Sequence, residues 1–297
     1  MYHNPVLLKE SIEGLQIREG GVYVDATYGG GGHSREILKN IGSGSLIAFD
    51  QDIDAIGNEI SDERLTLIQQ NFRYARNFLK LYKAVPVNGI LADLGISSHQ
   101  IDDGDRGFSV RFDAELDLRM NREKGMSAKE IVNSWPVREI RNIMFRYGDL
   151  KNAGKVAASI EGYRNGKEIT TTTELKEAIS KCAPRGLENK FFAKVFQALR
   201  IEVNDELGAL KELLLQSVDL LDKGGRIVVI SYHSLEDRLV KNFFKSGDFE
   251  GRQEKDFYGN LISSLRPVTK KPIVPTEEEI KNNSRARSAK LRIAEKI

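Results

Sequence analysis

Three aspartates in the first third of the chain could bind the polar groups of a ligand. Asp25, Asp50 and Asp93 close the short apolar runs GVYVDAT, SLIAFD and GILADLG. If these runs are parallel strands, the acids lie along the carboxyl edge of one sheet, where open α/β folds bind ligands. The sequence therefore predicts a ligand site with three carboxylates at that edge.

A glycine run, Gly29 to Gly32, lies between the first apolar run and the helical segment SREILKNI. Glycines let the backbone approach a ligand closely and direct its amide groups at it. Gly29 and Gly31 fit the first two places of the dinucleotide fingerprint GxGxxG, but Ser34 occupies the third. Asp50 closes the next run, where an acid can accept both ribose hydroxyls of an adenosine. Loop and acid together predict a nucleoside ligand.

Charge indicates which nucleoside ligand this is. A dinucleotide brings a pyrophosphate, which Asp25 and Asp93 would repel, whereas S-adenosylmethionine brings an ammonium group that they could accept. S-adenosylmethionine is therefore the expected cofactor. Phe72, in QQNF, could lie against the adenine, although an aromatic here is as often part of the core.

Two polar segments follow apolar runs and could hold a substrate. ADLGISSHQIDDGDRGFS offers the donors and acceptors of Ser97, Ser98, His99 and Gln100, and Gln100 is long enough to reach back to the cofactor. SYHSLEDRLVK would place Tyr232 and His233 at the carboxyl edge. The alternatives are an exposed polar loop for the first segment and a His-Ser pair capping a helix for the second.

The order of elements predicts an α/β fold with a doubly wound and mostly parallel sheet. Together with the expected cofactor, this is the Rossmann-like class I methyltransferase fold. The three runs alternate with helical segments, and a fourth strand, GGRIVVISYHS, comes only after Gly224. A long amphipathic helix, DELGALKELLLQSVDLL, precedes that strand, and Gly224-Gly225 would suit its end.

Between residues 105 and 195 the β-branched runs are replaced by helical segments. Ser127 with Glu130, and Thr171 with Glu174, have the spacing of capping boxes; Ser234 with Asp237 is a looser example. We therefore expect residues 1–104 and 196–297 to form the cofactor-binding domain and residues 105–195 to be an inserted helical domain that recognises the substrate.

Composition excludes several classes of protein. Hydrophobic residues make up 40% of the chain and charged residues 30%, and no apolar run approaches the roughly 20 residues that cross a bilayer. The amino terminus has no export signal, so a soluble, cytoplasmic protein without a membrane partner is expected. Cys182 is the one cysteine and the four histidines lack ligand spacing, so neither a disulfide nor a metal site is expected.

Positive charge is concentrated at the end of the chain. Residues 266–297 hold nine Lys or Arg against four Asp or Glu. Such a cluster could contact phosphates or form a solvated helix face, and it contains Arg285, Arg287, Lys290 and Arg292. Elsewhere, phosphate contacts could come from Arg106, Arg111, Arg119 and Arg200, although ordinary ion pairs are the alternative for each.

Seven segments together resemble the MraW (RsmH) family of bacterial small-subunit ribosomal RNA cytosine methyltransferases. They are HNPVLL, DATYGGGGHS, ADLGISSHQIDDGDRGFS, ELDLRM, KVFQALRIEVNDEL, SYHSLEDRLVK and SRARSAKLRIAEK, and they span nearly the whole chain. Two departures are mild: Ala92 replaces a larger aliphatic residue, and Tyr232 stands where the family often has Phe.

The resemblance implies methylation of the exocyclic amine, N4, of one cytosine in small-subunit (16S) ribosomal RNA, within an assembled or nearly assembled subunit. It also implies that the insertion helps to hold RNA. The residues that it implies for S-adenosylmethionine binding are Gly31, Gly32, His33, Asp50, Phe72, Asp93 and Gln100. His33 follows from the resemblance alone.

We expect direct in-line transfer without a covalent intermediate, with Asp93, Asn204 and His233 forming the amine pocket. Two rival functions remain open. An NAD-dependent oxidoreductase is disfavoured by Ser34 and by the carboxylates around the glycine run. A non-catalytic RNA-binding or ribosome assembly factor should have lost the acids Asp50 and Asp93. The sequence leaves the oligomeric state open, a homodimer included.

Overall fold

The computed structural model describes residues 5–253, 255, 257–258 and 263–297, without the side chains of Ser98 and His99. The chain divides into two compact units, residues 1–95 with 207–297, and residues 96–206. The predicted insertion, 105–195, lies inside the second unit, which is longer at both ends. A division after residue 195 would cut the helix α10 (Glu188–Asn204), which is buried through Leu199 and Ile201.

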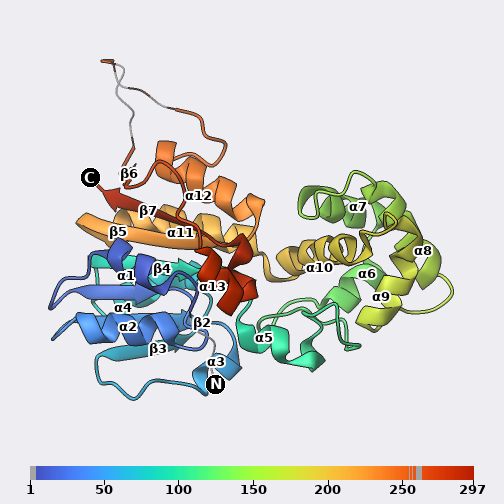
Figure 1. Ribbon diagram of the computed structural model, residues 1–297, viewed down its shortest axis with the longest axis horizontal. Helices are drawn as coiled ribbons and strands as arrows, with labels where there is room; N and C mark the ends of the chain where they lie inside the picture. The colour runs from blue at the N-terminus through green and yellow to red at the C-terminus, as the bar shows by residue number, and fades with distance from the viewer. Residues whose placement is uncertain (1–4, 254, 256, 259–262) are drawn as a thin grey trace. The chain divides into compact units, whose positions relative to one another are not determined.

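The first unit contains a seven-stranded sheet in the order β3-β2-β1-β4-β5-β7-β6 (Figure 1). Its parallel strands are β1 (Val22–Asp25), β2 (Ser45–Asp50), β3 (Leu65–Gln69), β4 (Val87–Asp93) and β5 (Leu221–Ser231). Two antiparallel pairings add β7 (Lys290–Lys296) and β6 (Leu265–Pro267) at the far edge. The predicted α/β fold is confirmed.

Helices cover both faces of this sheet because successive strand residues point to opposite sides. One face buries Val24, Phe49 and Ile90 against helices α4 (Ala75–Leu81), α11 (Glu206–Leu220) and α12 (Ser234–Ser246). The other buries Tyr23 and Leu91 with α1 (Leu8–Leu15) and α2 (Gly32–Asn40). The short elements α3 (Ile53–Ile56), η1 (Phe72–Tyr74), α13 (Glu277–Asn282) and η4 (Ser284–Ser288) complete the unit.

The strand order reverses between β1 and β4, which places a ligand crevice at their carboxyl ends. Asp25 and Asp93 are the last residues of these two strands, and Asp50 ends the neighbouring β2. The three carboxylates therefore lie on the edge that the sequence predicts.

The second unit is helical and has its own apolar core, which includes Ile131, Ile143, Val156 and Leu199. Its elements are α5 (Ser98–Asp102), η2 (Gly104–Arg106), α6 (Ala128–Ser134), α7 (Val137–Arg146), α8 (Ala153–Arg164), α9 (Thr172–Ile179), η3 (Ser180–Cys182) and α10. The capping boxes predicted at Ser127 and Thr171 are both present. Cys182 is buried.

One expectation about local structure was wrong. Helix α11 ends at Leu220, before Gly224, because β5 begins at Leu221. In the basic stretch that ends the chain, Lys290 and Arg292 lie in strand β7, which pairs with β5, whereas Arg285 and Arg287 lie in the short helix η4. None of the helices in the described part of the chain has the length and apolar character that a bilayer span requires.

Candidate functional site

Asp25 is held inside the carboxyl edge of the sheet. Its side chain is 1% exposed, and it accepts hydrogen bonds from the Ser34 hydroxyl (2.6 Å) and the Thr27 amide (3.1 Å). Burial raises the pKa of this carboxyl against the lowering effect of both donors. Ser34, which occupies the third place of the glycine fingerprint, therefore holds the Asp25 carboxylate by a hydrogen bond. This carboxylate would repel a pyrophosphate.

Asp50 anchors the glycine loop. Its carboxylate accepts the Gly29 amide at 2.8 Å and the Asp52 amide at 2.9 Å. Burial nevertheless raises the pKa of Asp50 from 3.8 to about 6. A ligand that donated hydroxyl groups to this carboxylate would stabilise its charged form, as an adenosine ribose would.

The start of α2 is shaped by glycines and by the N-terminal segment. Gly31, the residue before the helix, has a left-handed backbone with φ of 71°, and no side chain caps the helix. A Cβ on Gly32 would lie 2.2 Å from Cγ of Pro5. No side chain that the structure describes therefore engages the first amides of α2, and Pro5 packs against the first residue of the helix.

The pKa of Asp93 is raised further than that of Asp50. Its amide donates to Thr27 Oγ1 (2.7 Å), and its Oδ1 accepts the hydroxyl of Tyr232 at 2.8 Å. Burial, with repulsion from Asp25 and Glu236, raises the pKa of Asp93 from 3.8 to about 7. Such a carboxyl can accept or hold a proton near neutral pH.

His33 joins this group from α2. Its Nδ1 lies 3.9 Å from Asp93 Oδ2, and its Nε2 lies 3.2 Å from the carbonyl oxygen of Val6. Because that carbonyl can only accept, Nε2 carries the proton, and burial lowers the pKa of the imidazole to about 4. No spacing in the sequence singled out His33, because its contacts come from Val6 and Asp93, far away along the chain.

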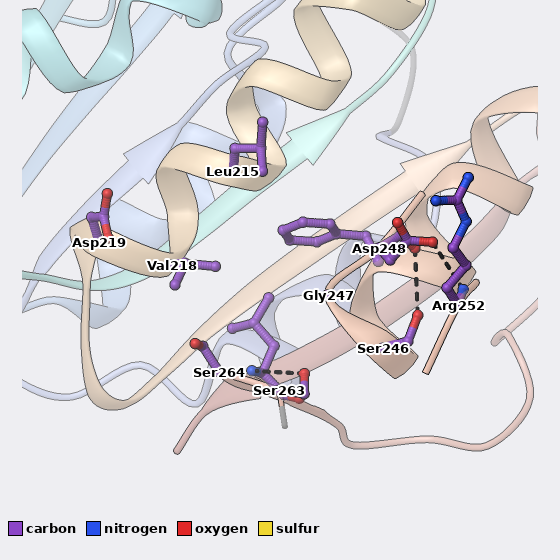
Figure 2. A pocket seen from close by; sticks show the side chains of 11 residues that line it. Leu215, Val218, Asp219, Ser246, Gly247, Asp248, Arg252, Ser263 and Ser264 are labelled. Atoms are coloured by element: carbon purple, nitrogen blue, oxygen red, sulfur yellow. Dashed lines mark hydrogen bonds between the residues drawn. The ribbon is translucent and has the colours of Figure 1, made fainter. Parts of the chain in front are cut away.

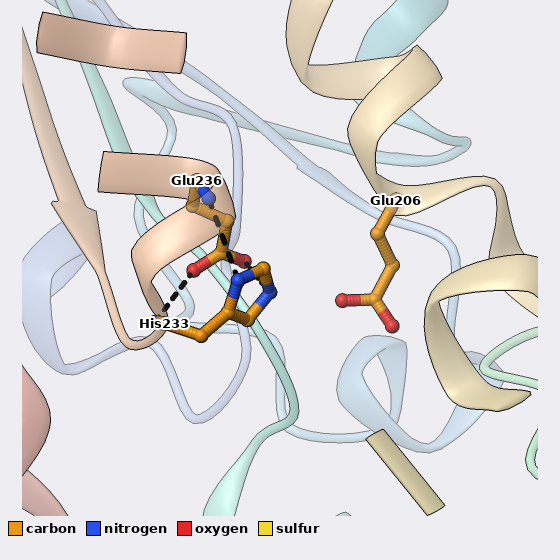
Figure 3. A group of neighbouring side chains, drawn as sticks. All are labelled: Glu206, His233 and Glu236. Carbon is orange, nitrogen blue, oxygen red and sulfur yellow. Dashed lines mark hydrogen bonds and ion pairs between the residues drawn. The ribbon is translucent and has the colours of Figure 1, made fainter. Parts of the chain in front are cut away.

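His233 caps α12 and makes its contacts with Glu236 (Figure 3). Its Nδ1 accepts the Glu236 amide at 3.4 Å, and its Nε2 lies 3.2 Å from Glu236 Oε1. The Glu236 carboxylate in turn accepts the amides of Tyr232 and His233. The capping box is therefore His233 with Glu236, one residue earlier than the predicted Ser234 with Asp237.

Phe72 lies at the carboxyl end of the sheet, in η1 directly after β3. Its ring is partly buried against the apolar cluster that contains Phe49 and Leu79. Phe72 therefore contributes to the apolar core, which is the alternative that the sequence analysis gave for it. The part of the residue that is exposed is available to a ligand.

Ser97 and Gln100 belong to the second unit and bond to each other. The Ser97 amide donates to Gln100 Oε1 (3.0 Å), and the Gln100 amide donates to Ser97 Oγ (3.2 Å). Gln100 is 4% exposed. The side chain of Ser98, also predicted to bind substrate, lies outside the described residues.

Three of the four arginines of the second unit that were predicted to contact phosphates have protein partners. Arg106 is 2% exposed and donates to the carbonyls of Arg119 and Met120. Arg119 pairs with Asp117 at 2.7 Å, and Arg200 pairs with Glu206 at 2.7 Å. The ion-pair alternative thus describes Arg119 and Arg200, and Arg106 holds a loop.

Asn204, predicted to line the amine pocket, is engaged within the second unit. Its Oδ1 accepts the Met120 amide at 2.7 Å, and its Nδ2 donates to the carbonyls of Leu118 and Arg200. These bonds tie the end of α10 to the segment around Leu118, whose φ is 62°.

The basic residues near the end of the chain differ in their surroundings. Arg285 and Arg287 lie in η4, where Arg287 is exposed and Arg285 partly so. Lys290 and Arg292 are instead paired with Asp237 of α12, at 3.1 and 2.7 Å. The pairing with Asp237 engages Lys290 and Arg292 within the protein, and contact of Arg285 and Arg287 with RNA phosphates stays a prediction.

The first unit also has a pocket of about 420 Å³ lined by other residues (Figure 2). Leu215 and Val218 of α11, Phe243 and Ser246 of α12, and Leu265 of β6 contribute to it. None of the predicted site residues lines this pocket, so it is not the predicted cofactor site.

Comparison with known proteins identifies the family of this chain. The MraW methylase family matches residues 1–297. The chain belongs to this family. Relatives called ribosomal RNA small subunit methyltransferase H include those of Flavobacterium johnsoniae, 54% identical over 100% of the chain and 98% of the relative, and Parabacteroides distasonis, 55% identical with the same coverage. The expected class, an S-adenosylmethionine-dependent methyltransferase, is confirmed for this MraW-family chain.

One solved structure, a putative methyltransferase from Streptococcus mutans in complex with SAH, aligns over 100% of both chains with 12% identity and a TM-score of 0.46. This likeness is too distant to add to the assignment, which rests on the sequence.

The residues at the carboxyl edge suit S-adenosylmethionine. Asp50 and Asp93 are partly buried carboxylates whose pKa values are raised by desolvation, and hydroxyl or ammonium donors of a ligand would stabilise their charged forms. Gly31 and Gly32 allow Tyr28 and Pro5 to pack closely against the start of α2, where no described side chain caps the helix. The negatively charged pyrophosphate of a dinucleotide would be repelled by these acids, which disfavours a dinucleotide.

Proposed function

We propose that this MraW-family protein methylates the exocyclic amine, N4, of a cytosine in small-subunit ribosomal RNA. The observation that carries the proposal is the full-length match, at 54 and 55% identity, to relatives whose names specify that RNA. The buried carboxylates at the ends of β1, β2 and β4 support it, because they suit a cationic nucleoside cofactor. The target base and its atom come from the family resemblance.

In this proposal each aspartate has its own task. Asp50 accepts the ribose hydroxyls, Asp25 supports the loop through Ser34, and Asp93 lies beside the reacting groups. Gly31 and Gly32 give access to the amides of α2. S-adenosylmethionine, when bound, supplies an electrophilic methyl group on its sulfonium sulfur.

The cytosine amine is a weak nucleophile because its lone pair is delocalised into the ring. Most of the rate must therefore come from holding the amine in line with the methyl group, with an acceptor for the released proton. Asp93, whose pKa is about 7, suits an acceptor at neutral pH. Asn204 and His233 are proposed to orient the amine through the segments that they hold.

RNA binding is assigned to the second unit and to the exposed end of the first. A base reaches such a pocket only when it is unstacked, which suits a loop in an assembled or nearly assembled small subunit. Arg285 and Arg287 are proposed phosphate contacts. Ser97, Ser98 and Tyr232 remain proposed neighbours of the target base, and Arg106, Arg119 and Arg200 are proposed to shape the RNA-facing segments that they hold.

Transfer of labelled methyl from S-adenosylmethionine to unmodified small subunits tests this proposal. We expect label on a cytosine amine with the intact protein, and at least a hundredfold less with Asp50→Ala or Asp93→Ala. Asp222→Ala, which changes an exposed aspartate in the bulge that opens β5, is the matched control and should leave transfer unchanged. Tight cofactor binding without label on subunits or naked RNA would contradict the proposal and favour an RNA-binding assembly factor.

A further inference from the structure

The hydroxyl of Tyr232 is the one side-chain donor that reaches the Asp93 carboxylate among the described residues. It lies 2.8 Å from Oδ1, and the ring that carries it follows directly after β5, the strand paired with β4. Asp93 therefore receives this donor from a neighbouring strand, independently of the glycine loop. The bond leaves the other oxygen, Oδ2, for a different partner.

The surroundings of Oδ2 identify what that partner must be. His33 Nδ1 is 3.9 Å away, too far for a hydrogen bond, and it presents a lone pair because Nε2–H donates to Val6. Two acceptors thus face the same space. A ligand that brings a hydrogen-bond donor, such as an amine or ammonium group, could satisfy both.

The other charged groups around Asp93 oppose its ionisation. Asp25 on β1 and Glu236 on α12 both act on it by like-charge repulsion, and the buried imidazole of His33 is neutral because its pKa is about 4. Tyr232 counters them. Its own pKa is raised well above 10, so it stays a donor throughout the neutral range.

We propose that Tyr232 is a positioning residue for methyl transfer: its hydroxyl holds Oδ1 of Asp93, which keeps the carboxylate ionised and directs Oδ2 toward the donor group of the bound ligand. This inference rests on the proposed function where it is tested by the rate of methyl transfer. The bond between Tyr232 and Asp93 can be tested without any methyl transfer. Because the hydroxyl lowers the pKa of Asp93, its removal must raise that pKa above about 7.

Tyr232→Phe tests this in the pH profile of methyl transfer. A hydrogen bond to a charged group shifts an acid constant by about tenfold, so we expect the acidic midpoint of kcat/KM to move up by about one pH unit. At pH 9 the variant should approach the rate of the unaltered protein. Tyr163→Phe, which removes another tyrosine bond to a carboxylate, that of Glu177, is the matched control and should leave the midpoint in place.

A uniform loss of rate at every pH, with the midpoint unmoved, would overturn the inference because a purely structural role would produce it. Incorporation of 3-fluorotyrosine at position 232 provides a second variant that keeps the ring and strengthens the donor. It should move the midpoint to lower pH, and a shift in the same direction as Tyr232→Phe would also overturn the inference.

Titration of the aspartate carboxyl carbons by NMR, without substrate, separates this inference from the proposed function. Asp93→Asn identifies the Asp93 signal. We expect its midpoint to rise in Tyr232→Phe even if no RNA is methylated, in which case the proposed function fails while the hold of the Tyr232 hydroxyl on Asp93 is upheld. An unchanged Asp93 midpoint, with methyl transfer intact, would refute the positioning role alone.

Discussion

Buried carboxylates define the chemistry of this protein at the scale of single residues. Asp25, Asp50 and Asp93 are raised in pKa, and desolvation is the largest cause for each. The charged forms of such desolvated carboxyls reduce the stability of the ligand-free protein. They gain hydrogen-bond donors when a ligand binds. The site is therefore complementary to donors that the chain itself does not supply.

The dependence of stability on pH follows from these shifts. In the folded protein the pKa values of Asp50 and Asp93 are about 6 and about 7, compared with the ordinary value of 3.8 expected in the unfolded chain. Their contribution to the free energy of unfolding is therefore full below about pH 4 and is lost as the pH rises through 6 and 7. Asp93→Asn, which cannot ionise, should gain about 1–2 kcal/mol in unfolding free energy relative to the unaltered protein between pH 5 and pH 8.

Urea unfolding at several pH values checks this prediction. His33 titrates in the opposite direction, because its folded pKa is lowered to about 4, but its contribution is common to both proteins and cancels in the difference. Asp222→Asn, at an exposed position, serves as the control and should run parallel to the unaltered protein. Parallel curves for Asp93→Asn as well would show that Asp93 is not perturbed in the folded chain.

At the scale of elements, the N-terminal segment packs against α2 beside the glycine loop. Pro5 packs on Gly32, the Val6 carbonyl accepts from His33, and the Leu7 amide donates to Glu279 of α13 at 2.7 Å. The first residues of the chain therefore support the helix whose start faces the cofactor site. This explains why a glycine is needed inside α2 and not only in the loop before it.

Gly32→Ala should disturb both stability and cofactor binding. The added Cβ would lie 2.2 Å from Pro5, so the segment must shift, and we expect a loss of about 1–3 kcal/mol in unfolding free energy with weaker S-adenosylmethionine binding. Calorimetric titration and thermal unfolding measure the two effects. Gly154→Ala in α8, where nothing lies within 4 Å, is the control and should stabilise the protein by about 0.5–1 kcal/mol. Equal behaviour of the two variants would rule out the packing argument.

At the scale of the whole molecule, each unit buries its own core. The apolar cluster of the helical unit draws on residues from Phe108 to Leu199, and both clusters that flank the sheet lie entirely in the first unit. A segment with a core of this kind can fold alone.

Residues 96–206 should therefore fold in isolation with a single cooperative urea transition followed by circular dichroism. A fragment of residues 105–195 is the matched comparison. It lacks the end of α10, including Phe196 and Leu199, which are buried, and Asn204, which ties α10 to residues 118–120. We expect it to be largely unfolded. Cooperative folding of the shorter fragment only would show that the domain boundary lies nearer residue 195.

Local patterns in the sequence determined the class of fold and the main elements of the site. Apolar runs that end in acids, a glycine run and capping boxes act within a few residues, so Asp25, Asp50, Asp93, Ser127 and Thr171 could be interpreted without the tertiary structure. The family resemblance then determined the expected reaction.

The tertiary structure alone decided where distant partners meet. Strand β7 exists because KLRIAEK finds the free edge of β5, and Lys290 and Arg292 pair with an aspartate 53 and 55 residues away. Tyr232 meets Asp93 across 139 residues in the same way. The sequence alone could not predict these contacts, because the pairing of strands and the burial of charges depend on how separate elements pack, which no local spacing encodes.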